Sequence, residues 1–306
     1  MLSNYASPVI DLRRLEALVA LHRTGTVSAA AAQLHYGQPT ISHHLRRLEA
    51  ETGATLVQRV GRGVRLTAEG ERLALRGEEV LGLLARAEEE LRAATSLQSG
   101  TVRLASFPSG AATLVPDAIA LLAAEHPGLA LDLTEAEPPE AFELLRAGSV
   151  DLALTFAYPD QPEPEQITSV PILDDPLHLV VPAGTGRSRD EDTVDLADYA
   201  ATRWITGCER CRRELLTLCS DAGFVPTIAF ASDDYVAVQS LVATGLGVTV
   251  LPGLALRAHQ HHAVVRRPVA GAQRRVQLST YGAPPRPAGV DAVAAVLTEV
   301  ARRVSG

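Results

Sequence analysis

The sequence contains no lysine, and it also lacks the segments that would carry a chain into or across a membrane. No stretch approaches the eighteen or more consecutive apolar residues of a membrane span, and no basic N-terminal region precedes an apolar run as in an export signal. We therefore expect a cytoplasmic protein with no membrane partner. All 28 basic residues are arginine, in the acidic parts of the chain as elsewhere, which we interpret as genomic coding bias.

Motifs for catalysis and for cofactor binding are also missing. We find no nucleophile elbow, no phosphate-cradling glycine loop and no dinucleotide fingerprint, so we expect no enzyme, no cofactor and no metal. Cysteine is scarce, but Cys208 and Cys211 have the two-residue gap of a dithiol switch or of half a zinc site. Cys219, on the same expected helix, is too far from Cys211 for a bridge. The alternative function is therefore a DNA-binding thiol or metal sensor that uses Cys208 and Cys211.

Residues 27–67 predict two short helices, a tight turn and a basic hairpin. An alanine-rich segment over 27–34 allows close helix crossing, and Gly37 marks a turn before a second helix that has Pro39 in its first turn. In that helix Ile41, Leu45 and Leu48 face inward. After Gly53, the hairpin over 57–67 carries three arginines around two glycines. The order of these elements predicts a winged helix-turn-helix, which reads double-stranded DNA.

The outward face of the second helix carries short polar side chains followed by charges, which suits a helix whose start enters a major groove. These side chains belong to Gln38, Thr40, Ser42, His43, Arg46 and Arg47. In the hairpin, Arg62 and Arg65 are placed to contact the phosphate backbone or the minor groove. The residues up to Leu66 hold eight arginines against four acids, although the whole chain has a net charge of −8. Positive charge is therefore concentrated where the DNA-reading geometry is expected.

This stretch resembles the N-terminal domain of LysR-type transcriptional regulators. The matching segments are Ala-Ala-Ala-Gln-Leu at 30–34, Gln-Pro-Thr-Ile-Ser at 38–42, Leu-Arg-Arg-Leu-Glu at 45–49 and the hairpin at 59–67. The resemblance implies DNA contacts by Gln38, Pro39, Ser42, the following His43, and Arg62.

Three residues depart from the family pattern: Gly37 stands where serine is common, His43 where arginine is usual, and Val57 where phenylalanine is usual. Because a neutral imidazole offers one donor and one acceptor, whereas arginine can bridge both acceptors of guanine, His43 predicts an unusual base preference at its position.

A long, highly charged helix is predicted over 68–98. Its apolar and small residues repeat alternately four and three apart, as in a coiled-coil seam. The seam consists of Leu73, Gly77, Val80, Leu84, Ala87, Leu91 and Ala94. The alternative is a solvated helix joining two domains, but we expect a second copy of the chain as partner. Such a homodimer presents two winged domains to a two-fold operator, and the family resemblance implies a homotetramer.

From residue 101 onward, strands alternate with helices in an α/β pattern. Prolines between 159 and 176 exclude a long helix there, so we expect a second sheet to start at 177–181. The segments at 151–154 and 242–252 resemble the LysR effector domain, which has the two-lobed fold of periplasmic solute-binding proteins. The expected domains are 1–67 for DNA binding, 68–98 as dimerisation linker and 99–306 for effector binding. Lobe I comprises about 101–176 and 279–306, and lobe II about 177–278.

In such a fold a ligand binds between the lobes, at strand ends and helix starts. The loop at 106–110 has no acid, so its hydroxyls and N–H groups suit a carboxylate or another acceptor. We predict an effector site formed by Ser106, Phe107, Ser109, Phe156, Thr206 and Asp233. Asp233 and Asp234 could instead cap the helix that follows. The expected function is a sequence-specific transcription regulator controlled by a small-molecule effector. An exported solute-binding protein would share the fold but would need an export signal and no basic winged domain.

Overall fold

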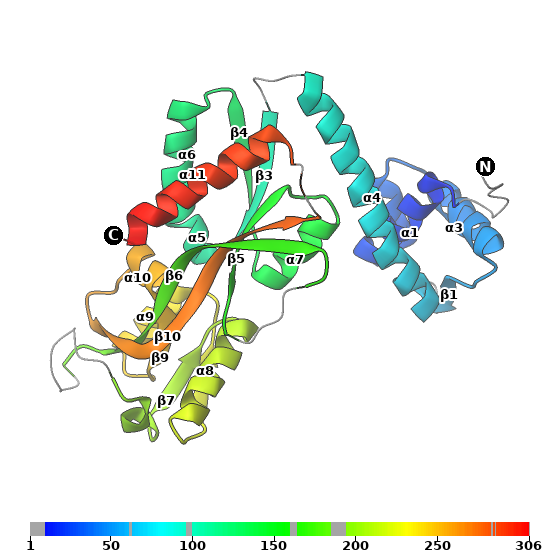
Figure 1. Ribbon diagram of the computed structural model, residues 1–306. Coiled ribbons are helices and arrows are strands. Elements are labelled where there is room, and N and C mark those ends of the chain that lie inside the picture. Colours follow the sequence, from blue (N-terminus) through cyan, green and yellow to red (C-terminus); the bar gives the residue numbers. More distant parts are fainter. Residues whose placement is uncertain are drawn as a thin grey trace. The chain divides into compact units, whose positions relative to one another are not determined.

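The computed structural model (Figure 1) describes residues 10–60, 63–95, 100–159, 164–184, 194–282, 284 and 286–305. The chain folds as two compact units. The first comprises Met1–Thr95 with Glu143–Ser149, and the second comprises Ser96–Phe142 with Val150–Gly306. Each unit has its own cluster of buried apolar side chains.

Three helices form most of the core of the first unit. They are α1 (Leu12–Thr24), α2 (Val27–Gln33) and α3 (Gln38–Thr52). The start of α3 at Gly37 has no side-chain cap, and Pro39 stands in its first turn, where the missing N–H costs no helical hydrogen bond. The inward positions predicted for α3 are confirmed, because Ile41, Leu45 and Leu48 are all buried. Packing on this apolar stripe fixes which side of α3 faces outward.

A two-stranded hairpin follows α3. It consists of β1 (Val57–Val60) and β2 (Gly63–Leu66), paired antiparallel with Val57 opposite Leu66. The Glu49 carboxylate of α3 accepts hydrogen bonds from the N–H groups of Leu56 at 2.9 Å and Val57 at 3.1 Å. This contact ties the start of the hairpin to α3. Arg62, at the predicted tip, lies outside the described residues.

The long helix α4 (Ala68–Thr95) begins at a close contact with the segment before the hairpin. The Thr67 hydroxyl accepts the N–H of Gly70 at 3.0 Å, as an N-cap does. A Cβ atom on Gly70 would lie 2.1 Å from the carbonyl oxygen of Leu56. Only glycine therefore allows the helix to approach the backbone so closely at this point.

The predicted seam of α4 is divided between two environments. A Cβ atom on Gly77 would lie 2.8 Å from Leu15 Cδ1 and 2.9 Å from Val19 Cγ2, so this position packs on α1 of the same chain. The prediction that Gly77 faces a second copy is therefore wrong, because α1 already covers it. Further along, Val80 and Leu84 are exposed. The side chains of the last two seam positions, at 91 and 94, lie outside the described part of the chain.

Six strands form the main sheet of the second unit, in the order β4-β3-β5-β10-β6-β9. Their bounds are β3 Gly100–Ser106, β4 Leu129–Glu135, β5 Leu152–Ala157, β6 Ile167–Pro182, β9 Thr249–Pro252 and β10 Val264–Tyr281. β3 is parallel to β4 and β5, whereas β10 is antiparallel to both β5 and β6. The predicted α/β fold class is confirmed.

The expectation that a second sheet starts at Leu177 is wrong. β6 is one strand of 16 residues that pairs along β10 through both lobes. Its two internal prolines fit because each pairs beside a register shift: Pro171 lies opposite Gln277 and Pro176 opposite Gln273. A shift in the ladder removes the need for the N–H that proline lacks. The prolines thus mark irregularities within a strand, and the strand continues across them.

Helices cover the sheet on the lobe I side. They are α5 (Pro108–Ala111), α6 (Leu114–Glu125) and α11 (Ala288–Ser305), while α7 (Pro138–Arg146) follows β4 and ends within the first unit. α6 and α11 pack against each other, and α11 also packs on β3 (Figure 1). Buried Leu104, Leu297 and Val293 belong to the cluster between these helices and the sheet.

Lobe II adds a parallel pair, β7 (Arg203–Thr206) and β8 (Thr227–Ala231). The Ile205 N–H donates to the carbonyl oxygen of Val248 at 2.8 Å, which joins β7 to the segment entering β9. The surrounding helices are η1 (Leu196–Tyr199), α8 (Glu209–Asp221), α9 (Tyr235–Ala243) and α10 (Gly253–Ala258). Trp204 is fully buried against Phe224. Within the described residues, every helix is too short or too polar to span a membrane.

Candidate functional site

The outward face of α3 is polar and basic. Its side chains are exposed at Gln38, Pro39, Thr40, His43, Arg46 and Arg47, and half-buried at Ser42. The two acids of α3 are engaged elsewhere, because Glu49 holds the hairpin backbone and Glu51 forms an ion pair with Arg14. The face therefore presents hydrogen-bonding groups at its start and positive charge one turn later.

The hairpin adds further positive charge. Arg59 on β1 and Arg65 on β2 are exposed, and Arg65 lies opposite Gln58 across the ladder. Arg65 and the basic turns of α3 all belong to the first unit. The wing position Arg62 is not among the described residues. The structure thus brings the predicted residues of α3 onto one face and leaves one wing arginine unplaced.

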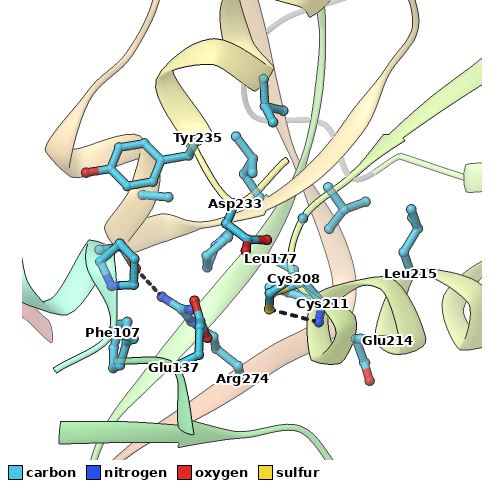
Figure 2. Close-up of a pocket in the computed structure, with 18 of the residues that line it drawn as sticks. Phe107, Glu137, Leu177, Cys208, Cys211, Glu214, Leu215, Asp233, Tyr235 and Arg274 are labelled. Carbon is cyan, nitrogen blue, oxygen red and sulfur yellow. Dashed lines mark hydrogen bonds between the residues drawn. The ribbon is translucent and has the colours of Figure 1, made fainter. Parts of the chain in front are cut away.

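A cavity that is partly open to solvent lies between the lobes of the second unit. Its walls come from the loop after β3, the start of α8, the loop before α9 and the strands β6, β9 and β10 (Figure 2). Part of its lining is apolar and is contributed by Leu177, Leu215, Leu218, Val250 and Leu251. Glu137, Asp233 and Glu214 place carboxylates on the wall. Mixed apolar and polar lining of this kind is typical of a small-molecule site.

Arg274 is a buried arginine in the wall of the cavity, held by several contacts. Its side chain is 3% exposed; Nε donates to the Asp175 carboxylate at 2.9 Å, and Nη2 donates to the Ser109 hydroxyl at 2.8 Å. The guanidinium also lies over the rings of Phe107 and Phe156, 4.7 and 4.5 Å from their centroids. Burial lowers the pKa of Arg274, but Asp175, Tyr158 and Cys211 together outweigh burial and leave the pKa raised. Arg274 is therefore a fixed cation joining β10 to the loop after β3.

The two cysteines of the CxxC motif lie on the cavity wall where α8 begins. Cys208 is the N-cap of α8, and its Sγ accepts the N–H of Cys211 at 3.4 Å. The two sulfur atoms are 2.8 Å apart, with the Cys208 thiol donating to Cys211. The Tyr158 hydroxyl also donates to Cys211 Sγ, at 3.6 Å. The third cysteine, Cys219, is fully buried.

The predicted effector residues fall into two layers. Phe107, Ser109 and Asp233 line the cavity. Ser106, Phe156 and Thr206 do not line it, because their side chains are buried beneath the wall. Each of the three lies inside or at the end of a strand, whereas the lining comes from the residues that follow.

Asp234, and not the neighbouring Asp233, caps the start of α9. The Asp234 carboxylate accepts the N–H groups of Val236 at 2.8 Å and Ala237 at 3.2 Å. Asp233 stands on the cavity wall. Of the two acids that the sequence offered as caps, Asp234 therefore caps α9 and Asp233 faces the cavity.

Sequence reasoning missed Arg274, Glu137 and Tyr158. A signal for Arg274 is present in β10, where Ala272 and Val276 flank it at a spacing of two and all three are buried. Glu137 follows the end of β4, so the rule applied to other strand ends would have included it. Burial raises the pKa of Glu137, and nearby Arg274 opposes that shift. Within the described residues, no group of three or more His, Cys, Asp or Glu side chains is arranged to hold a metal ion.

A winged helix-turn-helix in one unit and a two-lobed α/β fold with an internal cavity in the other define the class of DNA-binding transcription regulators with a substrate-binding domain. The chain belongs to the LysR family of these regulators. Residues 95–302 match the LysR substrate binding domain, and residues 12–71 match the bacterial regulatory helix-turn-helix protein of the lysR family. The resemblance inferred from the sequence motifs is confirmed.

Similar proteins cover most of the chain. An uncharacterized HTH-type transcriptional regulator, YcgK of Bacillus subtilis, is 29% identical over 81% of this chain and 82% of its own length. The transcriptional dual regulator OxyR of Escherichia coli is 28% identical over 81% and 80%. Among solved structures, a full-length OxyR variant from Pseudomonas aeruginosa has a TM-score of 0.69 at 23% identity, covering 95% of this chain and 96% of that one. CbnR has a TM-score of 0.65 at 23% identity, covering 97% and 99%.

Proposed function

We propose that this LysR-type regulator binds a specific two-fold DNA site and that a small molecule in the inter-lobe cavity controls the binding. The observation that carries the proposal is the outward face of α3, where polar side chains precede arginines and both acids are turned away. Such a face suits base reading at the helix start and phosphate contact behind it. We assign DNA contacts to Gln38, Pro39, Thr40, Ser42, His43, Arg46, Arg47, Arg62 and Arg65.

The cavity supports the regulatory half of the proposal. Its apolar side and its converging polar groups offer a site for a small molecule between the two lobes. A ligand that contacts both lobes favours a closed arrangement, because only there does it make its full set of contacts. We assign ligand contacts to Phe107, Ser109 and Asp233. Ser106, Phe156 and Thr206 support these residues from beneath the wall.

We further propose that the regulator works as a homodimer through α4 and assembles into a homotetramer. Val80 and Leu84 leave apolar surface exposed on α4, and their spacing of four places them on one side of the helix. A second copy would cover this surface and supply a second α3 for the other half-site. The proposed division is 1–67 for DNA binding, 68–98 for dimerisation and 99–306 for effector binding.

Selection of bound sequences from random DNA by the full-length protein tests the proposal. We expect enrichment of two half-sites related by two-fold symmetry, with their spacing set by the dimer. Recovery of DNA without any common motif would count against a sequence-specific regulator. Site size and symmetry would remain measurable whether or not the effector is known.

Arg46→Ala should weaken binding to selected and unrelated DNA alike. Arg46 is exposed one turn behind the base-reading positions, which suits a phosphate contact. Each phosphate contact contributes roughly 0.9 to the slope of log K against log salt, so loss of Arg46 from both copies in a dimer should lower the slope by roughly 1.8. Fluorescence anisotropy over a salt series measures both effects. Arg72→Ala is the matched control, because Arg72 is exposed on α4 and pairs with Glu69; an equal change in both variants would contradict the assignment.

His43→Arg should change which base pair is preferred while keeping the overall affinity similar. His43 is exposed on the outward face of α3. An arginine there can donate two hydrogen bonds to guanine, so we expect guanine to be enriched at one position of each half-site. Repeating the DNA selection with the variant measures this preference. An identical motif from the two proteins would remove His43 from the base-reading set.

A second candidate function is thiol sensing, and the closeness of the Cys208 and Cys211 sulfur atoms on the cavity wall favours it. Among the relatives, proteins from Escherichia coli and Pectobacterium carotovorum named as hydrogen peroxide-inducible genes activators are 28% identical to this chain. In this case the signalling compound reacts with the two cysteines in the cavity wall, and the regulator still acts by binding DNA. Metal sensing lacks such support, because the described residues contain no group of three or more potential metal ligands.

A further inference from the structure

We propose that the CxxC pair is a hydroperoxide-reactive dithiol in which Cys211 is the nucleophile and Cys208 the resolving thiol. The inference rests on the second candidate function and specifies its chemistry. It assigns unequal roles to the two cysteines and names the class of oxidant that fits the cavity.

The hydrogen bonds around the two sulfurs are asymmetric. Cys211 Sγ accepts from the Cys208 thiol at 2.8 Å and from the Tyr158 hydroxyl at 3.6 Å, whereas Cys208 Sγ gives its proton to Cys211 and accepts the Cys211 N–H at 3.4 Å. Donors aimed at a sulfur favour its thiolate form, which is the reactive one. Cys208 therefore holds a proton and Cys211 is the sulfur prepared to lose one.

Charge acts in the same direction. The Cys208 hydrogen bond lowers the pKa of Cys211 against the effect of burial, and the positive charge of Arg274 lowers it further. For Cys208, the hydrogen bond it gives to Cys211 and its burial both raise the pKa. Arg274 is held in place by Asp175 and Ser109, so its charge stays near the pair.

The reaction consumes one hydroperoxide and no other reagent. The Cys211 thiolate attacks the terminal oxygen, so an S–O bond forms, the O–O bond breaks, and the alcohol or water leaves after taking a proton. The sulfur of Cys208 then attacks Cys211, forming the S–S bond and releasing water, which includes the proton lost by Cys208. The sum is two thiols and one hydroperoxide giving one disulfide, one alcohol or water, and a second water.

The wall of the cavity selects among oxidants. Glu137, Asp233 and Glu214 line it together with the two thiols, while its lining cation, Arg274, is already paired with Asp175. An anionic oxidant such as glutathione disulfide would meet these carboxylates, whereas a small neutral hydroperoxide would not. The half-buried position of both cysteines also favours a small reagent.

Oxidation would also remove a helix cap. Cys208 Sγ accepts the N–H of Cys211, one of the free N–H groups in the first turn of α8. Once Cys208 is bonded to Cys211, its sulfur is a poorer acceptor and no longer donates to Cys211. The start of α8 and the wall it forms therefore differ between the dithiol and the disulfide, which gives the reaction a structural consequence at the cavity.

Peroxide treatment of the reduced full-length protein tests the inference. We expect loss of two of the three thiols and a disulfide between Cys208 and Cys211, while Cys219 stays reduced. Trypsin cleaves after Arg210, between the two cysteines, so the disulfide appears in mass spectra as two joined peptides. Wild-type protein that keeps all three thiols under hydrogen peroxide would overturn the proposal.

The variants assign the roles. In Cys208→Ser, dimedone should trap a sulfenic acid on Cys211. In Cys211→Ser, oxidation of Cys208 should be roughly tenfold slower or more than that of Cys211 in Cys208→Ser, because burial raises the pKa of Cys208 and keeps its thiol protonated at pH 7. Cys219→Ser is the matched control and should react like wild type. Dimedone labelling of Cys208 in Cys211→Ser at the same rate as labelling of Cys211 in Cys208→Ser would overturn the assignment.

Tyr158→Phe gives a test that keeps both cysteines and the ring. We expect Cys211 to oxidise roughly twofold to tenfold more slowly, the range of one hydrogen bond. An unchanged rate would show that Tyr158 does not activate Cys211 and would remove its support for the asymmetry.

Glutathione disulfide at the same concentration should react more slowly than hydrogen peroxide, and the reverse order would overturn the choice of oxidant. DNA selection by the reduced protein tests the proposed regulator separately. Failure there with intact thiol chemistry would contradict only the DNA-binding proposal.

Discussion

Arg274→Ala should lower the free energy of unfolding of the second unit by about 3–5 kcal/mol, the cost of removing one partner of a buried ion pair. The variant leaves the Asp175 carboxylate buried, at 2% exposure, without the guanidinium that neutralises it. It also removes the cation between Phe107 and Phe156. Urea unfolding followed by the fluorescence of Trp204, the single tryptophan and fully buried, measures the loss.

The neighbouring arginine provides the control for that experiment. Arg275 pairs with Asp174 at 3.7 Å, but both side chains are more than half exposed. An exposed pair of this kind contributes about 0–1 kcal/mol, so Arg275→Ala should unfold at nearly the wild-type urea concentration. Equal losses in the two variants would show that burial of the Arg274 pair does not set its effect.

Gly70→Ala should destabilise the first unit by about 1–3 kcal/mol or more, because the added methyl group cannot fit. Its Cβ atom would lie 2.1 Å from the backbone oxygen of Leu56, which no side-chain rotation can relieve. The start of α4 must then move away from the segment that leads into the wing. We expect faster amide hydrogen exchange in α3 and α4 and weaker DNA binding.

Gly37→Ser is the matched variant in the same unit. A Cβ atom there would meet Pro39 Cδ at 3.6 Å, an ordinary contact. Because Gly37 is the N-cap of α3 and supplies no side-chain oxygen, serine should stabilise the helix by a few tenths of a kcal/mol. Hydrogen exchange in α3 should therefore slow slightly in Gly37→Ser and accelerate in Gly70→Ala. The same exchange rates in both would contradict the close-contact explanation.

Local patterns in the sequence were sufficient for most elements of the fold. The apolar spacing of Ile41, Leu45 and Leu48 oriented α3 correctly, because a helix buries residues at intervals of three and four. The prediction failed in β6, where Pro171 and Pro176 suggested a break. A proline is compatible with a strand when the partner strand shifts register beside it, and that partner is β10, about 100 residues away.

The cavity was harder to predict than the fold. Phe107, Ser109 and Asp233 lie at strand ends and helix starts, which a sequence can locate. Arg274 joins Asp175 across 99 residues, so no local pattern pairs them. The CxxC motif was visible from its spacing, but the contact of Tyr158 with Cys211 depends on how the lobes fold together.

Pairing of β6 with β10 through both lobes limits how the lobes can move. Two antiparallel strands joined by a long ladder resist sliding, since sliding breaks every hydrogen bond between them. Bending across the ladder preserves those bonds, and it is easiest where the register shifts, near Pro176 opposite Gln273. Arg274 follows this position directly and is tied to Ser109 of lobe I. The position where the strands bend most easily is thus next to Arg274 in the chain. Bending there moves Arg274 and with it the part of the cavity wall that Arg274 forms.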